Sequence, residues 1–318
     1  MALQDMHIFN TWTQKVATET VDQKVRIFNE ASGGTLILGN EQTIGDYVEE
    51  ASYKIIGSLV SRRNAYGDNT VNDSNISQLK DVSVKVDGRV GPVIWTSEQF
   101  HRLGKSEQEA GLIIGEQAAE AMIQDYLNVA FMALKSAIAE HNELVHDGSA
   151  NNISLSALNK GAAKFGDRSQ SIKTWLMHST TYHDLIGEAI NNQNRLFNIG
   201  NINVHEDGLG RRYIFTDSPA LATTTGEDTL YHTLGLTPGA VQVQTGPLHS
   251  VTVDITGNEN LKKRWQGEFS YMLGLKGYAW KVATGGKSPN DTNLGTGANW
   301  EKIVTSHKDT AGVMVTSK

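Results

Sequence analysis

The stretch that decides the fold is residues 106–149, which read SEQEAGLIIGEQAAEAMIQDYLNVAFMALKSAIAEHNELVHDGS. Ser106 and Glu109 have the S-x-x-E spacing of a capping box, in which two side chains bond the free N–H groups at a helix start. Alanine is abundant and proline is absent throughout the stretch. The pattern predicts a helix from Glu107 to about Val145.

Apolar residues recur on this predicted helix at spacings of three and four, which places them on one face. They are Ala119, Met122, Tyr126, Val129, Ala133 and Ala137, and the face is widened by Leu127, Phe131, Leu134 and Ile138. Gly111 and Gly115 are weak points, each costing about 1 kcal/mol relative to Ala. A helix about 60 Å long, with a stripe too wide for a coiled-coil seam, indicates a structural spine.

Upstream of the spine, the sequence pattern of residues 1–65 predicts an arm followed by an amphipathic helix. The first 40 residues have weak periodicity, with a short helix expected at residues 14–29. Leu36 and Leu38 are too apolar for a free tail, so we expect the arm to pack on another subunit. Thr43 with Asp46 has capping-box character. The apolar positions of the helix that follows are Ile44, Tyr47, Val48, Ala51, Ile55 and Leu59.

Residues 66–100 predict an extended hairpin. Val82, Val84 and Val86 alternate with polar residues as in a half-buried strand. Asp87-Gly88 is typical of a hairpin turn, and residues 90–95 form the expected return strand. A two-stranded ribbon is at best marginally stable alone, so a neighbouring subunit is the expected partner. The resulting candidate interface residues are Val82, Val84, Val86, Val93, Trp95, Leu36 and Leu38.

Downstream, residues 151 to about 275 have a mixed α/β pattern. Helices are expected at 156–164 and 180–190, and strands at 172–177, 212–216 and in two pieces within 269–282. Alternating apolar residues on either side of Gly246-Pro247 predict a second hairpin. Residues 284–299 predict a polar loop, followed by last strands at 300–305 and 313–315.

Composition excludes several classes of protein. The chain has 318 residues, of which 31 are Gly. Its net charge of −7 argues against a dedicated nucleic-acid binder, because such proteins carry a positive electrostatic field. It has no Cys, so disulfides and thiolate metal sites are excluded. Neither a signal peptide nor a run of about 18 apolar residues is present.

Motifs of catalysis and cofactor binding are incomplete. Residues 285–288, Gly-Gly-Lys-Ser, lack the earlier glycine of a phosphate-binding loop, since that position is Lys281. The pairs His141/His146 and His178/His183 are five apart and lack the spacing of a zinc-protease helix. We therefore expect no catalytic residue, no metal and no cofactor. Trp265, Trp280 and Trp300 are expected in the core or an interface.

The order of these elements resembles the major capsid proteins of tailed bacteriophages, with the Hong Kong 97-type shell fold that encapsulins share. Several strings carry the resemblance. They are residues 28–34 (FNEASGG), 45–47 (GDY), 62–64 (RRN), 84–86 (VKV), 172–179 (IKTWLMHS) and 274–280 (GLKGYAW). The resemblance implies an α+β capsid fold with an N-terminal arm and first helix at 1–65, an extended E-loop at 66–100 and a peripheral-domain spine at 101–150. It implies an axial domain at 151–275 and a return to the peripheral domain at 276–318.

The function implied is that of a structural protein, not an enzyme, whose hexamers and pentamers form an icosahedral head around double-stranded DNA. The implied partners are other copies of the chain, scaffolding and portal proteins, a decoration protein, and DNA contacted without sequence preference, with no membrane. The implied location is the virion, after assembly in the host bacterial cytoplasm. Two alternatives stay open: an encapsulin-like compartment or other virion assembly protein, and a soluble α/β hydrolase with a cryptic triad.

Overall fold

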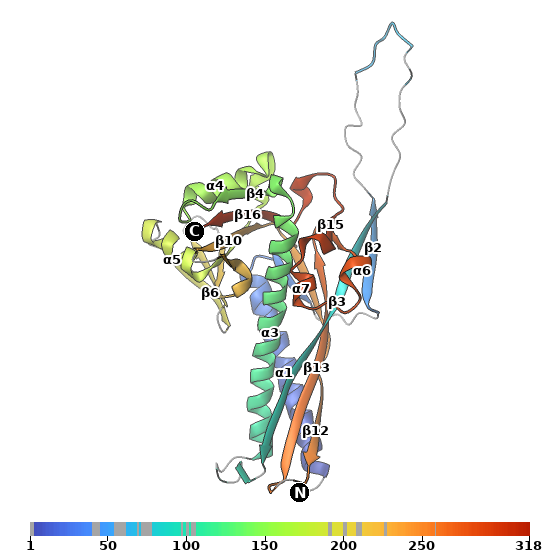
Figure 1. Ribbon diagram of the computed structural model, residues 1–318, viewed down its shortest axis with the longest axis vertical. Helices are drawn as coiled ribbons and strands as arrows, with labels where there is room; N and C mark the ends of the chain where they lie inside the picture. The colour runs from blue at the N-terminus through green and yellow to red at the C-terminus, as the bar shows by residue number, and fades with distance from the viewer. Residues whose placement is uncertain are drawn as a thin grey trace.

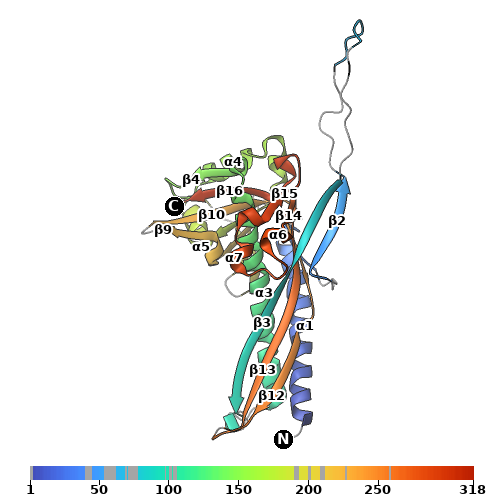
Figure 2. The same cartoon turned by 45° about the vertical axis from the view of Figure 1, so that its right-hand side comes forward.

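The computed structural model describes most of the chain, namely residues 3–39, 45–53, 62–68, 70, 78–96, 98–99, 102, 106–189, 193–199, 202–207, 212–225, 228–257 and 259–318. The fold has two eight-stranded sheets, here called sheet A and sheet B, and one long helix runs between them (Figure 1). Sheet A forms an elongated lobe with two helices along it, and sheet B forms a more compact lobe at one end (Figures 1 and 2).

The long helix α3 spans Glu107–Ala139 and begins as the sequence predicts. The hydroxyl of Ser106 accepts from the Glu109 N–H at 3.2 Å, and the Glu109 carboxylate accepts from the Ser106 N–H at 3.2 Å. The predicted end near Val145 is wrong, because Val145–Gly148 form strand β4 of sheet B. Its parallel partner is β16 (Gly312–Ser317), which is too distant in sequence to leave a local signal.

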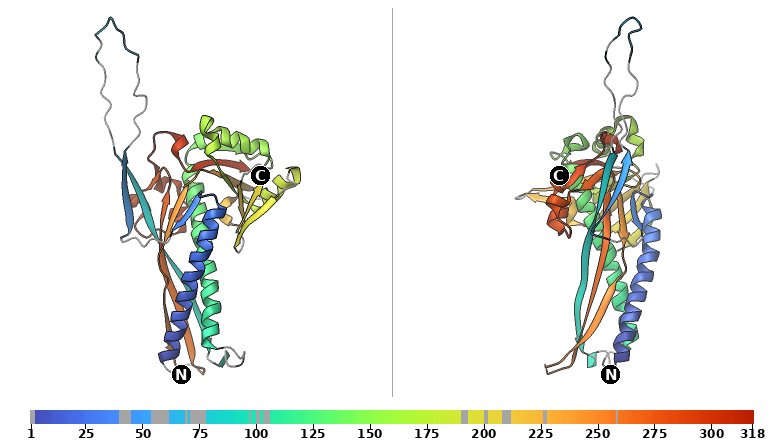
Figure 3. Two further views of the ribbon diagram at one scale, coloured as in Figure 1. Left: turned by 180° about the vertical axis from the view of Figure 1, so that it is seen from behind. Right: turned by 90° about the vertical axis from the view of Figure 1, so that its right-hand side faces the viewer.

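Helix α1 spans Leu3–Ala31 and is much longer than the short helix predicted at 14–29. It runs beside α3 (Figure 3), and Gly111 and Gly115 of α3 lie against the backbone of α1. A Cβ added at Gly115 would lie 2.9 Å from the Thr13 carbonyl oxygen, and one at Gly111 would lie 3.3 Å from the Phe9 carbonyl oxygen. The two glycines that weaken the helix by propensity therefore allow its partner to pack closely.

Sheet A is organised around its longest antiparallel pair, β3 and β13. Its strands are β1 (Leu36–Gly39), β2 (Tyr47–Tyr53), β3 (Gln78–Thr96), β11 (Val241–Thr245), β12 (His249–Ile255), β13 (Lys262–Leu275), β14 (Tyr278–Trp280) and β15 (Trp300–Lys302). Strand β13 pairs with β3, β11, β12 and β14. The predicted hairpin between β11 and β12 is wrong, because both strands pair with β13.

The turn predicted at Asp87-Gly88 is also wrong, since β3 is one continuous strand of 19 residues. Gly88 pairs with Phe269 of β13. A Cβ at Gly88 would lie 2.2 Å from the Phe269 ring, so the glycine makes room for a buried aromatic side chain. The strand that sequence analysis left without support is thus paired with β13 of the same chain from Val84 to Thr96.

The helix predicted between residues 43 and 63 is wrong over Tyr47–Tyr53, which form β2 and pair antiparallel with residues 78–84. The partner strand supplies hydrogen bonds that a 3.6-residue apolar period cannot reveal. The predicted positions Thr43, Ile44, Ile55 and Leu59 lie outside the described residues.

Sheet B has the order β4-β16-β10-β5-β8-β7-β6, with β9 beside β10. The strands not yet given are β5 (Thr174–His178), β6 (Gln193–Ile199), β7 (Ile202–Asp207), β8 (Arg212–Thr216), β9 (Ala222–Thr225) and β10 (Asp228–Leu236). Helices α4 (Leu155–Ala163) and α5 (Ser179–Ala189) accompany it. The predicted helices and strands at 156–164, 172–177, 180–190 and 212–216 are confirmed.

The sheets divide the chain differently from the expected boundaries at 151–275 and 276–318. Strands β11, β12 and β13 belong to sheet A, while β16 returns to sheet B and pairs with β10. Hydrogen bonding between strands that are remote in sequence determines which sheet each strand joins.

Short helices fill the remaining connections. They are α6 (Val282–Gly285), α7 (Asp291–Leu294), and the 3-10 turns at Asn142–Leu144, Gly166–Ser171, Pro219–Leu221, Gly297–Asn299 and His307–Asp309. The segment expected as a polar loop at 284–299 is folded around two buried indoles. Trp280 Nε1 donates to the Gly286 carbonyl and Trp300 Nε1 donates to the Leu294 carbonyl, each at 3.0 Å. Trp265, Trp280 and Trp300 are all buried, as predicted for core tryptophans.

Substituting Gly115→Ala tests the close approach of the two helices. Helix propensity alone would make the change stabilising by about 1 kcal/mol. We expect destabilisation by about 1–3 kcal/mol instead, because the added methyl meets the Thr13 backbone and overpacks the contact. Denaturant unfolding measures the effect, and Glu116→Ala at the adjacent exposed position is the control. Equal or greater stability of the Gly115 variant would contradict the account.

Candidate assembly surfaces

The seven residues predicted at a subunit interface occupy two different environments. Six are buried within the chain itself, namely Leu36, Leu38, Val82, Val84, Val86 and Trp95. Leu36 and Leu38 lie in β1, paired with β11, and the Trp95 ring packs 4.9 Å from Phe9 of α1. Val93 is exposed. These six side chains therefore face the chain's own core, and Val93 is the one of the seven that the surface presents.

Val93 belongs to a group of exposed β-branched residues on sheet A. Ile94 of β3 lies opposite Arg264 of β13, and Arg264 lies opposite Val253 of β12. The exposed fractions are 39% for Val93, 48% for Ile94, 48% for Val253 and 63% for Val251. Ile94, Val251 and Val253 lie on one face of the sheet, and we call these three residues the apolar row, whereas Val93 lies opposite Trp265 on the other face. The apolar row lies across a three-stranded ribbon that α1 and α3 accompany (Figure 2).

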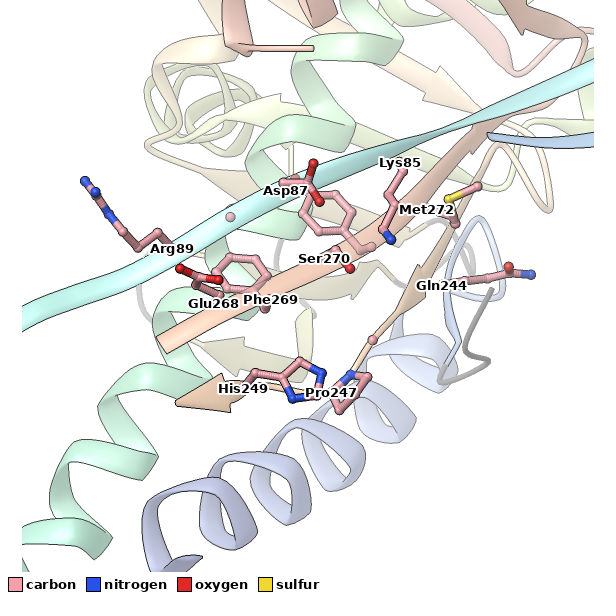
Figure 4. A pocket seen from close by; sticks show the side chains of 13 residues that line it. Lys85, Asp87, Arg89, Gln244, Pro247, His249, Glu268, Phe269, Ser270 and Met272 are labelled. Carbon is pink, nitrogen blue, oxygen red and sulfur yellow. The ribbon is translucent and has the colours of Figure 1, made fainter. Parts of the chain in front are cut away.

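A hollow of about 670 Å³ lies on the face of sheet A, over the paired strands β3 and β13 and the connection between β11 and β12 (Figure 4). Lys85, Asp87 and Arg89 of β3 line it, with Glu268 and His249 from the neighbouring strands. Arg89 lies opposite Glu268 in the ladder, so charges of both signs alternate along the hollow. Such a surface suits recognition of a polar partner segment.

A second hollow, of about 830 Å³, lies between β3, α3 and the segment that contains α7. Asp87, Asp125 and Asp291 line it. The Tyr271 hydroxyl donates to Asp125 Oδ2 at 3.3 Å, and burial raises the pKa of the Asp125 carboxyl. Sequence analysis did not single out Asp125, because its surroundings depend on β13.

A third hollow, of about 300 Å³, contains two carboxylates that face each other. Glu50 of β2 lies directly opposite Asp81 of β3, and both line the hollow. Asp81 Oδ1 is buried and accepts no hydrogen bond from the described residues. Burial and then the Glu50 charge raise the pKa of Asp81 to about 6. The pairing register brings these residues together, so no sequence pattern could have found them.

One local group of residues contains the Ser, His and Asp side chains that the hydrolase alternative would require. The Ser179 hydroxyl donates directly to Asp217, and His178 Nδ1 accepts the Thr180 N–H at 3.2 Å. A Ser–His–Asp relay needs the histidine between the serine and the aspartate, and this arrangement lacks that order. None of these four residues lines the hollows described above.

The described residues contain no group of three or more His, Asp or Glu side chains placed to hold a metal ion. No described helix combines the length and the apolar character needed to cross a lipid bilayer.

Solved structures share this fold. The capsid of Ralstonia phage GP4 is 10% identical with a TM-score of 0.51, over 90% of this chain and 87% of that chain. The structure of Mycobacterium phage Cain is 14% identical with a TM-score of 0.51, over 91% of this chain and 90% of that chain. The structure of Microbacterium phage Oxtober96 is 10% identical with a TM-score of 0.51, over 91% of each chain. The fold is therefore the Hong Kong 97-like fold of phage capsids.

The sequence model of the Gp13-like family, described as major capsid protein 13-like, matches residues 5–314. The chain belongs to this family, and it is a major capsid protein of tailed phages, a structural component of the virion shell. The search of curated proteins gives no match.

Substituting Asp81→Asn tests the opposed carboxylates. A native pKa of about 6 lies above the ordinary value of 3.8, so the folded protein binds more protons between about pH 4 and 6. The wild type therefore loses stability as the pH rises through that window. We expect the variant to be more stable at pH 7 by about 1 kcal/mol, a figure reduced for solvent screening. The difference should vanish below pH 4.

Thermal unfolding at pH 3.5, 5 and 7 measures this difference. Glu49→Gln is the matched control, because Glu49 forms an ion pair with Lys80 in the same ladder. A difference between Asp81→Asn and wild type that is constant across pH would contradict the assignment.

Proposed function

We propose that this chain assembles into hexamers and pentamers that form an icosahedral head enclosing double-stranded phage DNA. The observation that carries the proposal is the family match over residues 5–314. The described surface is consistent with it, since the apolar row and the three hollows offer contacts for neighbouring subunits. Many weak contacts repeated by symmetry can hold a large shell together.

The two lobes would occupy different positions in such a shell. In the proposal, sheet A with α1 and α3 forms the peripheral domain, and sheet B forms the axial domain near the centre of each capsomer. The β2–β3 ladder corresponds to the E-loop and reaches over an adjacent subunit. Contacts of this kind are head-to-tail and close into rings when the rotation between subunits permits.

The partners follow from the same proposal. Scaffolding and portal proteins guide assembly in the host cytoplasm, a decoration protein binds the finished shell, and packaged DNA contacts the inner wall without sequence preference. The net charge of −7 supports a container over a tight DNA binder, because weak attraction leaves packaged DNA free to move.

An encapsulin-like compartment is the remaining alternative, since the same fold serves there. The contents of assembled particles separate the two functions. Shells purified from infected cells should contain double-stranded DNA, whereas a compartment should contain protein cargo. Particles that hold only protein after nuclease-protected extraction would overturn the DNA-head proposal.

Substituting Ile94→Asp tests the apolar row as an assembly contact. The chain should fold normally because the side chain is exposed, but a charge buried at an interface is costly. We expect shell yield to fall at least about tenfold, because a loss of about 1.4 kcal/mol lowers the association constant of one contact tenfold and each shell repeats the contact many times. Electron microscopy and light scattering measure the yield.

Leu155→Asp is the matched control for this substitution, because Leu155 is 37% exposed and lies on α4 beside sheet B. Both variants should melt at the wild-type temperature. Normal shells from Ile94→Asp would remove Ile94 from the interface.

A further inference from the structure

The C-terminal end of α1 is held by a residue of the other lobe. The last carbonyl groups of a helix have no partner within the helix, and a cation close to them is stabilising. The last turn of α1 contains no basic residue. Arg212 of β8 supplies the cation instead, because its Nη1 donates to the carbonyl oxygens of Glu30 at 2.7 Å and Ala31 at 2.9 Å. Helix α1 therefore runs along the elongated lobe and ends on sheet B (Figure 3).

The turn that follows α1 is bonded to both lobes. The buried Ser32 carbonyl accepts from the Thr174 hydroxyl of β5 at 3.0 Å, which is a contact with sheet B. Two residues later, the Gly34 carbonyl accepts from the Gly239 N–H at 2.7 Å. Gly239 lies in the connection between β10 of sheet B and β11 of sheet A. The turn after α1 and a passage of the chain between the two sheets thus meet at one backbone hydrogen bond.

Both segments bend at this bond through glycines. The φ angles of Gly33, Gly34 and Gly239 are 69°, 67° and 70°, a region that favours glycine. Among the described residues, a Cβ at Gly34 would meet nothing within 4 Å, and one at Gly239 would meet only the end of Ile37 at 4.0 Å. Hinges are formed by a few residues that absorb changes in backbone angle. These three glycines therefore have the properties of a hinge between the lobes.

Arg212 lies directly against this hinge. A Cβ at Gly33 would be 2.8 Å from Arg212 Nη1, so the guanidinium occupies the space beside the glycine. Arg212 is also opposite Thr174 in the parallel β5–β8 ladder. The two side chains of sheet B that bond the end of α1 and its turn therefore come from neighbouring positions of one sheet. Together they determine how sheet B sits on α1.

We infer that Arg212 is a positioning residue that fixes the orientation of sheet B relative to the elongated lobe, by capping α1 beside the hinge formed by Gly33, Gly34 and Gly239. The consequence for assembly rests on the proposed shell function. Subunits in pentamers and hexamers meet at different angles, so one chain must accept a small range of lobe orientations. The glycines permit this range, and the two bonds of Arg212 limit it.

A distance measurement between two spin labels tests the orientation, and the absence of Cys from the chain leaves no background label. Lys160→Cys on α4 and Gln117→Cys on α3 place the labels on the two lobes at exposed positions. In dilute, unassembled chain, adding Arg212→Met should broaden the distance distribution at least about twofold, because the new side chain cannot donate to α1 and the hinge is released. A distribution as narrow as that of the wild type would overturn the inference.

Arg168→Met is the matched control, because it removes an arginine of the same lobe whose partner is Asp309 and not α1. It should leave the distribution unchanged, and equal broadening by this control would also rule out a specific role for Arg212. Gly33→Ala is a second way to disturb the cap, since the added methyl group would displace the guanidinium. It should broaden the distribution too, and a wild-type width would count against the inference even if Arg212→Met did not fold.

Particle size tests the consequence for assembly. Arg212→Met should give particles of more than one diameter by electron microscopy, while Arg168→Met should give the diameter of the wild type. Uniform particles of wild-type size from Arg212→Met would exclude a role of the cap in assembly. A wild-type chain that forms no particles, alone or with a scaffold, would count against the shell function. The spin-label result, obtained without assembly, would then still decide whether Arg212 orients the lobes.

Discussion

The structure depends on the antiparallel ladder between β3 and β13. It extends from Val84 opposite Leu273 to Thr96 opposite Lys262, and joins segments nearly 180 positions apart. The ladder gives the elongated lobe its length, brings β2 and β12 into the same sheet, and buries aromatic residues against α3. Tyr126 of α3 packs edge-on against Tyr271 and Phe269 of β13, with ring centroids 4.7 and 5.7 Å away. Both strands carry residues that line the hollows beside β3, so recognition surfaces follow from the same pairing.

Sequence patterns predicted the parts of the fold that local chemistry specifies. The Ser106 capping box set the start of α3, and the short segments 172–177 and 212–216 were correctly predicted as strands, which lie in sheet B. Elements decided by a distant partner were missed. Residues 47–53 read as a helix, but their pairing with 78–84 makes them a strand, and Gly88 read as a turn although it accommodates a remote aromatic ring.

The candidate sites show the same limit more sharply. Valines 82, 84 and 86 alternate as an interface strand would, yet alternation cannot say whose core covers the buried face, and here it is the chain's own. The opposition of Glu50 and Asp81 exists only through the register of β2 on β3. The surroundings of Asp125 likewise require β13 to be in place. Family resemblance gave the kind of protein, while three-dimensional pairing determines which residues its surface presents.

The path of the chain between the two sheets has a mechanical consequence. The chain passes from sheet A to sheet B through α3, returns to β11, and crosses again to end in β16. The last two crossings are bonded to each other, since the Thr237 N–H donates to the Ala311 carbonyl at 2.9 Å. A pull that separates the lobes would thus strain three covalent connections at once. A wall built of such units would resist outward pressure by stretching backbone, with no single linker that could yield first.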